Sequence, residues 1–183
     1  MSSDLSRRQH FEAIAAEVYD PLQRYLRRRA SSDDAGDLLG DVLLTIWRRV
    51  DDVPDESPLP WCYGVARRTL SNHRRGIRRR LRLVERLESE PPSAMLLDPA
   101  EGLEDDDLAA ALSALPAADQ EIIRLWAWEQ LEPREIAETL GSTANAVSLR
   151  LSRAKKKLAE TMSRQSPPES GHKGDRHAKE QGR

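Results

Sequence analysis

Apolar residues recur at intervals of three and four along most of the chain, which is the spacing of one face of an α-helix. The first periodic segment covers about Arg7 to Arg29, and Pro21 inside it predicts a break or bend. A second segment begins near Ser32 or Asp34. Their expected core residues are Phe11, Ile14, Ala15, Val18, Leu22, Leu26, Leu39, Val42, Leu43, Ile46 and Val50. Strand-like alternation is scarce, so the pattern predicts an all-α protein.

A proline-rich acidic stretch, Asp51 to Pro60, interrupts this pattern and predicts a loop. A third helix is expected from Pro60, with an inner face of Cys62, Val65, Ala66, Thr69 and His73. A separate narrow arc of the same helix contains Trp61, Arg68, Asn72, Arg75 and Arg79. Single-stranded DNA is held by a cationic track next to a stacking surface, and this arc offers both. The residues alone leave an equal alternative, in which Trp61 belongs to the core and the arginines only solvate the helix.

The stretch from Leu131 to Leu158 contains two helical patterns that meet at Gly141. Pro133 suits the first turn of the first helix, and Gly141 suits a helix end with a left-handed backbone. Thr143 can cap the second helix through its hydroxyl group. Two helices joined by a short turn that contains glycine predict a helix-turn-helix.

The second helix of this unit has one apolar side and one polar, cationic side. The apolar side consists of Ala144, Val147, Leu151, Ala154 and Leu158. The opposite side carries Asn145, Ser148, Leu149, Ser152, Arg153 and Lys156. In a helix-turn-helix this helix enters the major groove, where Arg and Lys contact phosphates and Asn, Ser and Arg reach base edges. The polar side is therefore predicted to bind duplex DNA, although a plain helical hairpin with a solvated face has the same spacing.

Upstream of the helix-turn-helix, the pattern predicts a helix, a turn led by Pro116 and another helix, which together support the DNA-binding unit. The apolar residues expected to build these supporting helices are Leu108, Ala111, Leu112, Leu115, Ile122, Ile123, Leu125, Trp126 and Trp128.

The net charge of −2 is small, but the charges are segregated along the chain. Trp61 to Arg86 contains nine arginines and one acid, whereas Glu88 to Asp107 contains eight acids and no basic residue. The acidic stretch has prolines and no helical stripe, so it predicts a flexible linker. The polar end of the chain predicts a disordered tail. The expected organisation is a helical domain at 1–87, a linker at 88–107, a second helical domain at 108–164 and a tail at 165–183.

Several classes of protein are disfavoured by what the sequence lacks. A single cysteine, Cys62, excludes an internal disulfide and a zinc site made of cysteines. No segment is apolar enough to cross a membrane, and no signal peptide follows Met1, so a cytoplasmic protein is expected. The chain has no Gly-rich phosphate loop, metal-ligand cluster or nucleophile–base pair. We therefore expect no enzymatic activity, no cofactor, no metal and no small-molecule substrate.

The order of these features resembles a known family. The sequence contains "DLLGDVLLTIWRR", then an Arg-rich helix opening with "WCYGVARRTLSNHRR", an acidic linker, "LPAADQEIIRLWAWEQL", and a helix-turn-helix ending in "VSLRLSRAKKKL". This order resembles a bacterial RNA polymerase sigma factor of the extracytoplasmic-function (ECF) group, which consists of sigma regions 2 and 4 only. The resemblance covers nearly everything from Phe11 to Met162.

The resemblance implies three partners: core RNA polymerase, promoter DNA and an anti-sigma factor. A membrane-bound anti-sigma factor would hold the protein at the membrane. Polymerase-binding candidates are Asp37, Asp41, Leu44 and Trp47. Candidates for the downstream (minus-ten) element are Trp61, Arg68, Asn72 and Arg75, with the loop from Asp51 to Pro60 helping to hold a flipped base. Candidates for the upstream (minus-thirty-five) element are Asn145, Ser148, Leu149, Arg150, Ser152, Arg153 and Lys156.

A second functional hypothesis is a stand-alone transcriptional regulator of the helix-turn-helix type. Such a protein would bind duplex DNA as a dimer, at two half-sites about one helical turn apart. It would have no use for the arc of tryptophan, arginine and asparagine on the third helix. The presence of that arc favours the sigma-factor hypothesis.

Overall fold

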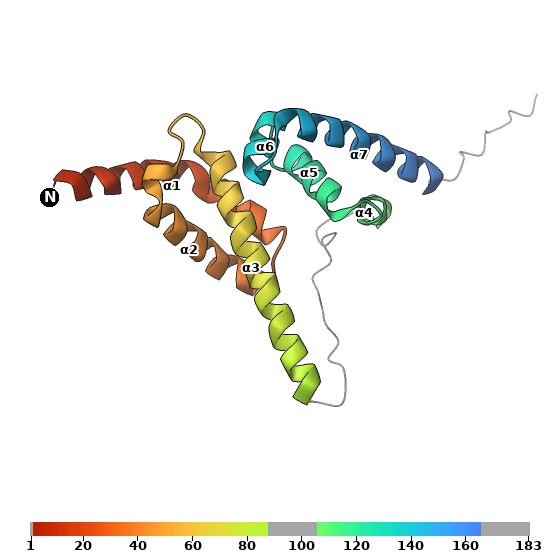
Figure 1. Ribbon diagram of the computed structural model, residues 1–183, viewed down its shortest axis with the longest axis horizontal. Coiled ribbons are helices and arrows are strands. Elements are labelled where there is room, and N and C mark those ends of the chain that lie inside the picture. Colours follow the sequence, from red (N-terminus) through yellow and green to blue (C-terminus); the bar gives the residue numbers. More distant parts are fainter. Residues whose placement is uncertain (1, 88–105, 166–183) are drawn as a thin grey trace, which may run out of the picture.

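The computed structural model describes residues 2–87 and 106–165, and all regular secondary structure in these two ranges is helical (Figure 1). The elements are α1 (Ser2–Arg27), α2 (Ser32–Arg48), the short 3-10 helix η1 (Val50–Asp52), α3 (Pro58–Leu87), α4 (Asp106–Ser113), α5 (Ala117–Ala127), α6 (Pro133–Leu140) and α7 (Ala144–Gln165). The predicted all-α fold is confirmed. The predicted linker and tail fall outside the described residues, except that α4 begins at Asp106 and α7 ends at Gln165.

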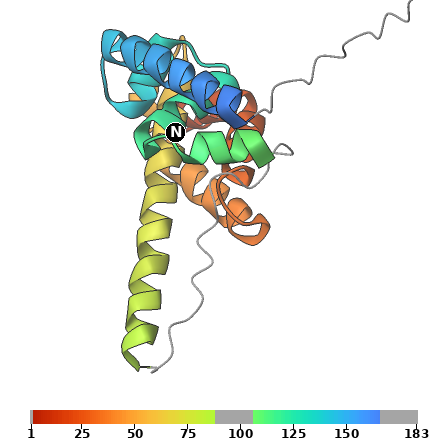
Figure 2. The same cartoon turned by 90° about the vertical axis from the view of Figure 1, so that its right-hand side faces the viewer.

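The N-terminal domain is a bundle of α1, α2 and the first half of α3. Their apolar stripes form its core, in which Val18, Leu22, Val42, Ile46 and Cys62 are fully buried. The second half of α3 extends well beyond this bundle (Figures 1 and 2). This projecting half carries most of the arginines, and its surface has no helix packed against it in the two views.

Pro21 was predicted to break or bend the first helix; it does not break it, because α1 continues through Pro21 to Arg27. The helix also begins earlier than predicted, at Ser2 rather than near Arg7. Proline removes one backbone hydrogen bond from a helix interior, but burial on both sides of it can offset that cost. Val18 and Leu22, which flank Pro21, are both fully buried and hold the helix together across it.

The C-terminal domain packs α4, α5 and α6 against α7. Gly141 ends α6 with a φ of 65°, a left-handed conformation that glycine adopts without strain. The hydroxyl oxygen of Thr143 accepts a hydrogen bond from the amide of Ala146 at 3.3 Å, so the predicted cap of α7 is confirmed. Val147, Leu151 and Ala154 are buried, as the apolar side of this helix requires.

Trp126, one of the apolar residues expected in the supporting helices, has a 42% exposed side chain. The Lys155 ammonium lies 3.2 Å from the centre of its ring, so a cation covers the aromatic face in place of apolar neighbours. Trp126 follows four consecutive buried residues of α5, Ile122 to Leu125, and lies at the exposed edge of that buried face.

The two domains pack directly against each other through α3 and α6 (Figure 1). The Thr139 hydroxyl donates a buried hydrogen bond to the backbone carbonyl of Pro60 at 3.0 Å. Gly64 allows this approach, because a Cβ atom there would lie 3.3 Å from the Thr139 carbonyl oxygen. The buried apolar residues of both domains therefore form one continuous cluster.

None of the helices in the described ranges combines the length and the apolarity needed to cross a membrane.

Candidate nucleic-acid and polymerase interfaces

The predicted arc on α3 is mostly solvent-exposed. Arg68, Asn72 and Arg75 are all exposed, and the guanidinium of Arg75 donates to the Asn72 side-chain oxygen at 2.7 Å. Trp61 is half-buried: it packs against the core, and the Arg49 guanidinium lies 5.2 Å from its ring centre. Both sequence interpretations of Trp61 therefore hold in part, since one side of the ring supports the core and a cation covers another.

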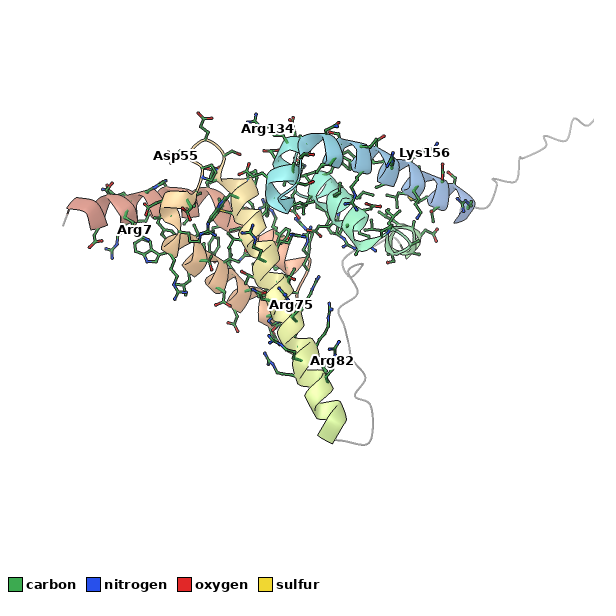
Figure 3. The ribbon with its side chains drawn as sticks, viewed as in Figure 1. Arg7, Asp55, Arg75, Arg82, Arg134 and Lys156 are labelled. Carbon is green, nitrogen blue, oxygen red and sulfur yellow. The ribbon has the colours of Figure 1, made fainter. Side chains whose placement is uncertain are left out.

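The loop before α3 is tied down by charged residues on either side of it. Asp52 pairs with Arg49 at 2.9 Å, Asp51 lies 3.7 Å from Arg7, and Asp55 lies 3.1 Å from His10. Figure 3 shows Asp55 on this loop, near the start of α3. These contacts hold the loop beside the end of α3 that carries Trp61.

Three of the four predicted polymerase-binding residues share an exposed face of α2. Asp37 and Asp41 are exposed, and Leu44 has a 44% exposed side chain between them and the end of the helix. Trp47 differs, because its ring packs edge-on against Phe11 at 5.3 Å and the Arg7 guanidinium lies over it. Trp47 therefore joins α2 to α1 and is only partly available to a partner.

The outward side of α7 is exposed along most of its length. Exposed positions include Asn145, Ser148, Leu149, Ser152, Arg153 and Lys156. Leu149 is 51% exposed, and Figure 3 shows Lys156 on the outer side of this helix. Arg150 behaves differently, because its guanidinium pairs with Asp119 of α5 at 2.9 Å. That ion pair directs the Arg150 guanidinium toward α5, while 49% of its side chain remains exposed.

A group of charged residues links the two domains and was not anticipated from the sequence. The side chain of Glu129 is 2% exposed, and it pairs with Arg28 and Arg29 from the end of α1. The Tyr63 hydroxyl donates to Glu129 at 3.4 Å, and the Tyr25 hydroxyl donates to Glu121 at 3.2 Å. We call this group the interdomain latch: Tyr25, Arg28, Arg29, Tyr63, Glu121 and Glu129.

Burial and the neighbouring charges shift the pKa values of two latch residues, Arg29 and Tyr25. Burial lowers the pKa of Arg29, but the negative charges of Glu121 and Glu129 and the nearby Tyr25 outweigh it, so that the pKa of Arg29 is raised overall. Burial, followed by the charge of Glu121, raises the pKa of Tyr25, so its hydroxyl remains a donor. The latch residues are about 100 positions apart in sequence, and no local pattern connects them.

Next to the latch, a cavity of about 1120 Å³ lies between the domains. Its lining includes Arg68, Asn72 and Arg75 of the predicted DNA arc, together with Glu121 from α5 and Arg150 from α7. In this arrangement part of the proposed single-strand surface faces the C-terminal domain.

The remaining titratable candidates have structural roles. Burial raises the pKa of the Cys62 thiol to about 12, so the thiol stays protonated and unreactive at neutral pH. His73 is half-buried and lies 3.4 Å from Asp34. A hydrogen bond from Ser31 lowers the pKa of Asp34; burial opposes this shift and His73 adds to it, so the pKa lies below its usual value. Within the described ranges, no group of His, Cys, Asp and Glu side chains could hold a metal ion.

Comparison with protein families identifies the class of protein. A family model described as "Sigma-70 region 2" matches residues 14–80, and one described as "Sigma-70, region 4" matches residues 105–158. The chain therefore belongs to the sigma-70 family, and its two-region organisation is that of the ECF group. Sigma factors bind core RNA polymerase and direct it to promoter DNA, and this is the function of the chain.

Solved structures agree with this family. The structure of the sigma factor RpoE in complex with the anti-sigma factor NepR from Bartonella quintana matches with a TM-score of 0.58 and 25% identity, covering 84% of this chain and 96% of that one. The structure of CnrH in complex with the cytosolic domain of CnrY matches with a TM-score of 0.57 and 22% identity, covering 85% and 89%. No curated protein matches the sequence significantly.

Proposed function

We propose that the two domains divide promoter recognition between them. Residues 1–87 bind the polymerase and the opened downstream element, and residues 108–164 bind the upstream element as a duplex. The observation that carries this proposal is the exposure of two cationic helix faces, on α3 and on α7, in different domains. In this proposal the chain has no catalytic residue of its own and acts in the cytoplasm.

The polymerase surface is the exposed face of α2 that carries Asp37, Asp41 and Leu44. Leu44 supplies an apolar contact next to two carboxylates on the same face, a combination that suits a partner with basic residues beside an apolar spot. Trp47 contributes by holding this face against α1 rather than by direct contact.

The downstream element is bound as a single strand along α3. Arg68 and Arg75 supply the cationic track, Asn72 supplies a base-edge donor and acceptor, and Trp61 supplies an aromatic surface. The loop carrying Asp51 and Asp55 holds the flipped base close to Trp61. Each stacked base contributes about 1–3 kcal/mol to this kind of binding.

The upstream element is read by the exposed side of α7. Arg153 and Lys156 contact phosphates, whereas Asn145, Ser148 and Ser152 lie where base edges would be reached. Leu149 offers an apolar contact of the kind that a thymine methyl group makes.

The spacing of the two promoter elements constrains how far apart the two domains lie when both are bound to DNA. Their names place them about 25 base pairs apart, or roughly 85 Å along straight B-DNA. Packing of α6 against α3 with a 3.0 Å hydrogen bond does not allow such a separation. We therefore assign the closed arrangement to the protein before promoter binding, and the domains separate when the holoenzyme engages DNA.

An anti-sigma factor is a natural regulator of such a closed form. The similar RpoE structure contains a bound anti-sigma factor. We propose that a protein of this kind binds this chain across both domains and delays their separation, and that a membrane-bound partner would hold the chain at the membrane.

The test is transcription by purified full-length chain and core RNA polymerase on promoter DNA selected with the holoenzyme. We expect a run-off transcript that core polymerase alone does not make. A chain that binds the selected DNA as a dimer without polymerase, and gives no transcript, would contradict this proposal.

A further inference from the structure

We propose that the cavity between the two domains is a binding site for an oligophosphate chain, and that this ligand stabilises the closed arrangement. The cavity is lined by eight arginines and a single acidic residue, Glu121. The cavity is open to solvent on one side, and its arginines come from both domains. A multivalent anion is the chemistry that such a space would recognise.

The positive charge of the cavity is only partly compensated. Glu121 and Glu129 neutralise Arg29, and Asp119 neutralises Arg150. The five cavity-lining arginines of α3 make no ion pair with a carboxylate within the described ranges: Arg67, Arg68, Arg74, Arg75 and Arg78. Like charges held together repel, so the closed arrangement has an electrostatic cost that a bound anion would remove.

Arg29 adds a buried cation beside the cavity. Its side chain is 5% exposed, and its Nη2 atom is buried without a hydrogen-bond partner among the described residues, so its charge acts on the cavity from below the lining. Nearby, the Arg74 guanidinium donates to the Arg29 backbone carbonyl at 2.8 Å. Burial lowers the pKa of Arg74, and the charges of Arg29 and Arg78 lower it further, whereas Glu121 and Tyr25 oppose this. An anion in the cavity would favour the charged state of both guanidinium groups.

The lining favours a phosphate chain over a nucleobase. Tyr25 is the one aromatic residue of the lining, and its ring already packs against Tyr63 at 5.1 Å and lies under the Arg29 guanidinium. No free aromatic surface of the described lining is left for stacking. Arginine binds phosphate oxygens through paired, parallel hydrogen bonds, so several arginines around one space suit linked phosphates.

Such a ligand would touch both domains only while they are closed. A ligand that binds one conformation more tightly shifts the population toward it. Competition between the oligophosphate and promoter DNA rests on the proposed function, in which Arg68 and Arg75 bind DNA. Binding of the oligophosphate to the free chain does not depend on that role, so the oligophosphate site and the proposed function can be disproved separately.

The first test measures binding of inorganic tripolyphosphate to the full-length chain by calorimetry at about 0.1 M salt. The double variant Arg74→Gln with Arg78→Gln removes two cations from the cavity. The matched control, Arg79→Gln with Arg80→Gln, removes two exposed cations of the same helix that do not line it. We expect one site per chain, at least tenfold weaker binding in the cavity variant and less than twofold change in the control. Equal losses in both variants would show general attraction to a basic helix and overturn the proposal.

The second test asks whether the site needs both domains. Glu129→Gln weakens the latch, and Glu138→Gln removes an exposed carboxylate from the same domain. We expect Glu129→Gln to bind tripolyphosphate about tenfold more weakly, and small-angle scattering to show that the ligand makes this variant more compact. Circular dichroism checks that its helices are intact. Unchanged affinity in Glu129→Gln would place the anion on α3 alone and overturn the proposal.

The source of the phosphate chain is distinguished by comparing tripolyphosphate with ATP. Equal affinities indicate a free polyphosphate, and tighter binding of ATP indicates a nucleotide. A short single-stranded oligonucleotide serves as the competing macromolecule. Should the oligonucleotide bind while tripolyphosphate and ATP do not, the cavity would be part of the DNA surface and the proposal would be wrong.

Discussion

Each of the two domains contains a long helix with one buried apolar side and one exposed cationic side, α3 in the first domain and α7 in the second. The helices that pack against α3 and α7 differ between the domains. In the N-terminal domain α3 rests on α1 and α2 with a core of its own, and then projects beyond it. In the C-terminal domain α7 rests on three short helices, two of eight residues and one of 11. A domain of this size buries a smaller fraction of its surface than a large domain does, and it is only marginally stable alone.

The smaller domain therefore relies on the larger one for part of its structure. Thr139 and Glu129 bury polar groups whose partners lie in the N-terminal domain, namely the Pro60 carbonyl and the pair Arg28 and Arg29. Separation of the domains would expose these groups to water, which satisfies them at modest cost. Such an interface is stable in the free protein and can still open when a large partner binds both halves.

Among the variants considered, Glu129→Gln is expected to weaken the contact between the two domains most. Removing one partner of a buried ion pair leaves the other charge uncompensated and costs about 3–5 kcal/mol. We expect the closed arrangement to lose roughly that much free energy, so that small-angle scattering reports a larger radius of gyration. Glu138→Gln is the control, because that carboxylate is exposed on α6. Equal radii for both variants and the wild type would mean that the latch does not hold the domains together.

The next largest effect is expected from Arg68→Ala combined with Asn72→Ala. Both side chains are exposed, so folding should be unaffected, whereas two contacts to the opened strand are lost. Promoter opening, measured by permanganate reactivity of unpaired thymines, should fall by about 100-fold. Binding to core polymerase should remain within about twofold.

The control for this double variant is Ser71→Ala with Arg80→Ala, which removes one cation and one neutral polar group from the same helix. It should open the promoter nearly as well as the wild type. If polymerase binding and opening decline together in the Arg68 and Asn72 variant, the division of roles between α2 and α3 is incorrect.

A smaller effect tests the turn that supports α7. Gly141→Ala should lower the free energy of unfolding by about 1 kcal/mol, because the residue has a φ of 65° and no clash adds to that strain. Gly36→Ala in α2 is the matched control. A Cβ there meets nothing within 4 Å, so alanine should stabilise the helix by about 0.5–1 kcal/mol. Thermal unfolding measures both, and the same sign for the two variants would contradict the assigned roles of these glycines.

The smallest predicted effect distinguishes two neighbouring arginines of α7. Arg153→Ala should weaken binding to the upstream element by about fivefold and reduce the slope of log affinity against log salt by about one unit. Arg150→Ala should change both quantities less, because its guanidinium is held by Asp119. Salt titrations of holoenzyme binding measure the slopes. A larger effect from Arg150 than from Arg153 would mean that the Asp119 pair breaks on DNA.

Local patterns were sufficient for most of the elements of both domains. The stripe of Val147, Leu151 and Ala154 is buried as its spacing predicted, and Gly141 and Thr143 end and begin helices as their chemistry requires. Leu44 is exposed on the same face of α2 as Asp37 and Asp41, at helical spacing from them. These features depend on residues a few positions apart, whose geometry a helix determines by itself.

Other features depend on contacts that the local pattern does not show. Pro21 lies inside a continuous helix, with the buried Val18 and Leu22 beside it, and Trp126 is exposed with the Lys155 ammonium over its ring. Trp47 and Arg150 remain predicted binding residues, and each also contacts a neighbouring helix, through Phe11 and Asp119 respectively.

The sequence alone determined that the chain is helical, that its cations are concentrated on two helices, and that those helices belong to a sigma factor. Only the tertiary structure decided that the two domains close on each other, with Glu129 buried between arginines and a cationic cavity beside it. Helical periodicity is a property of neighbouring residues, whereas an ion pair between positions about 100 residues apart exists only once the domains have packed.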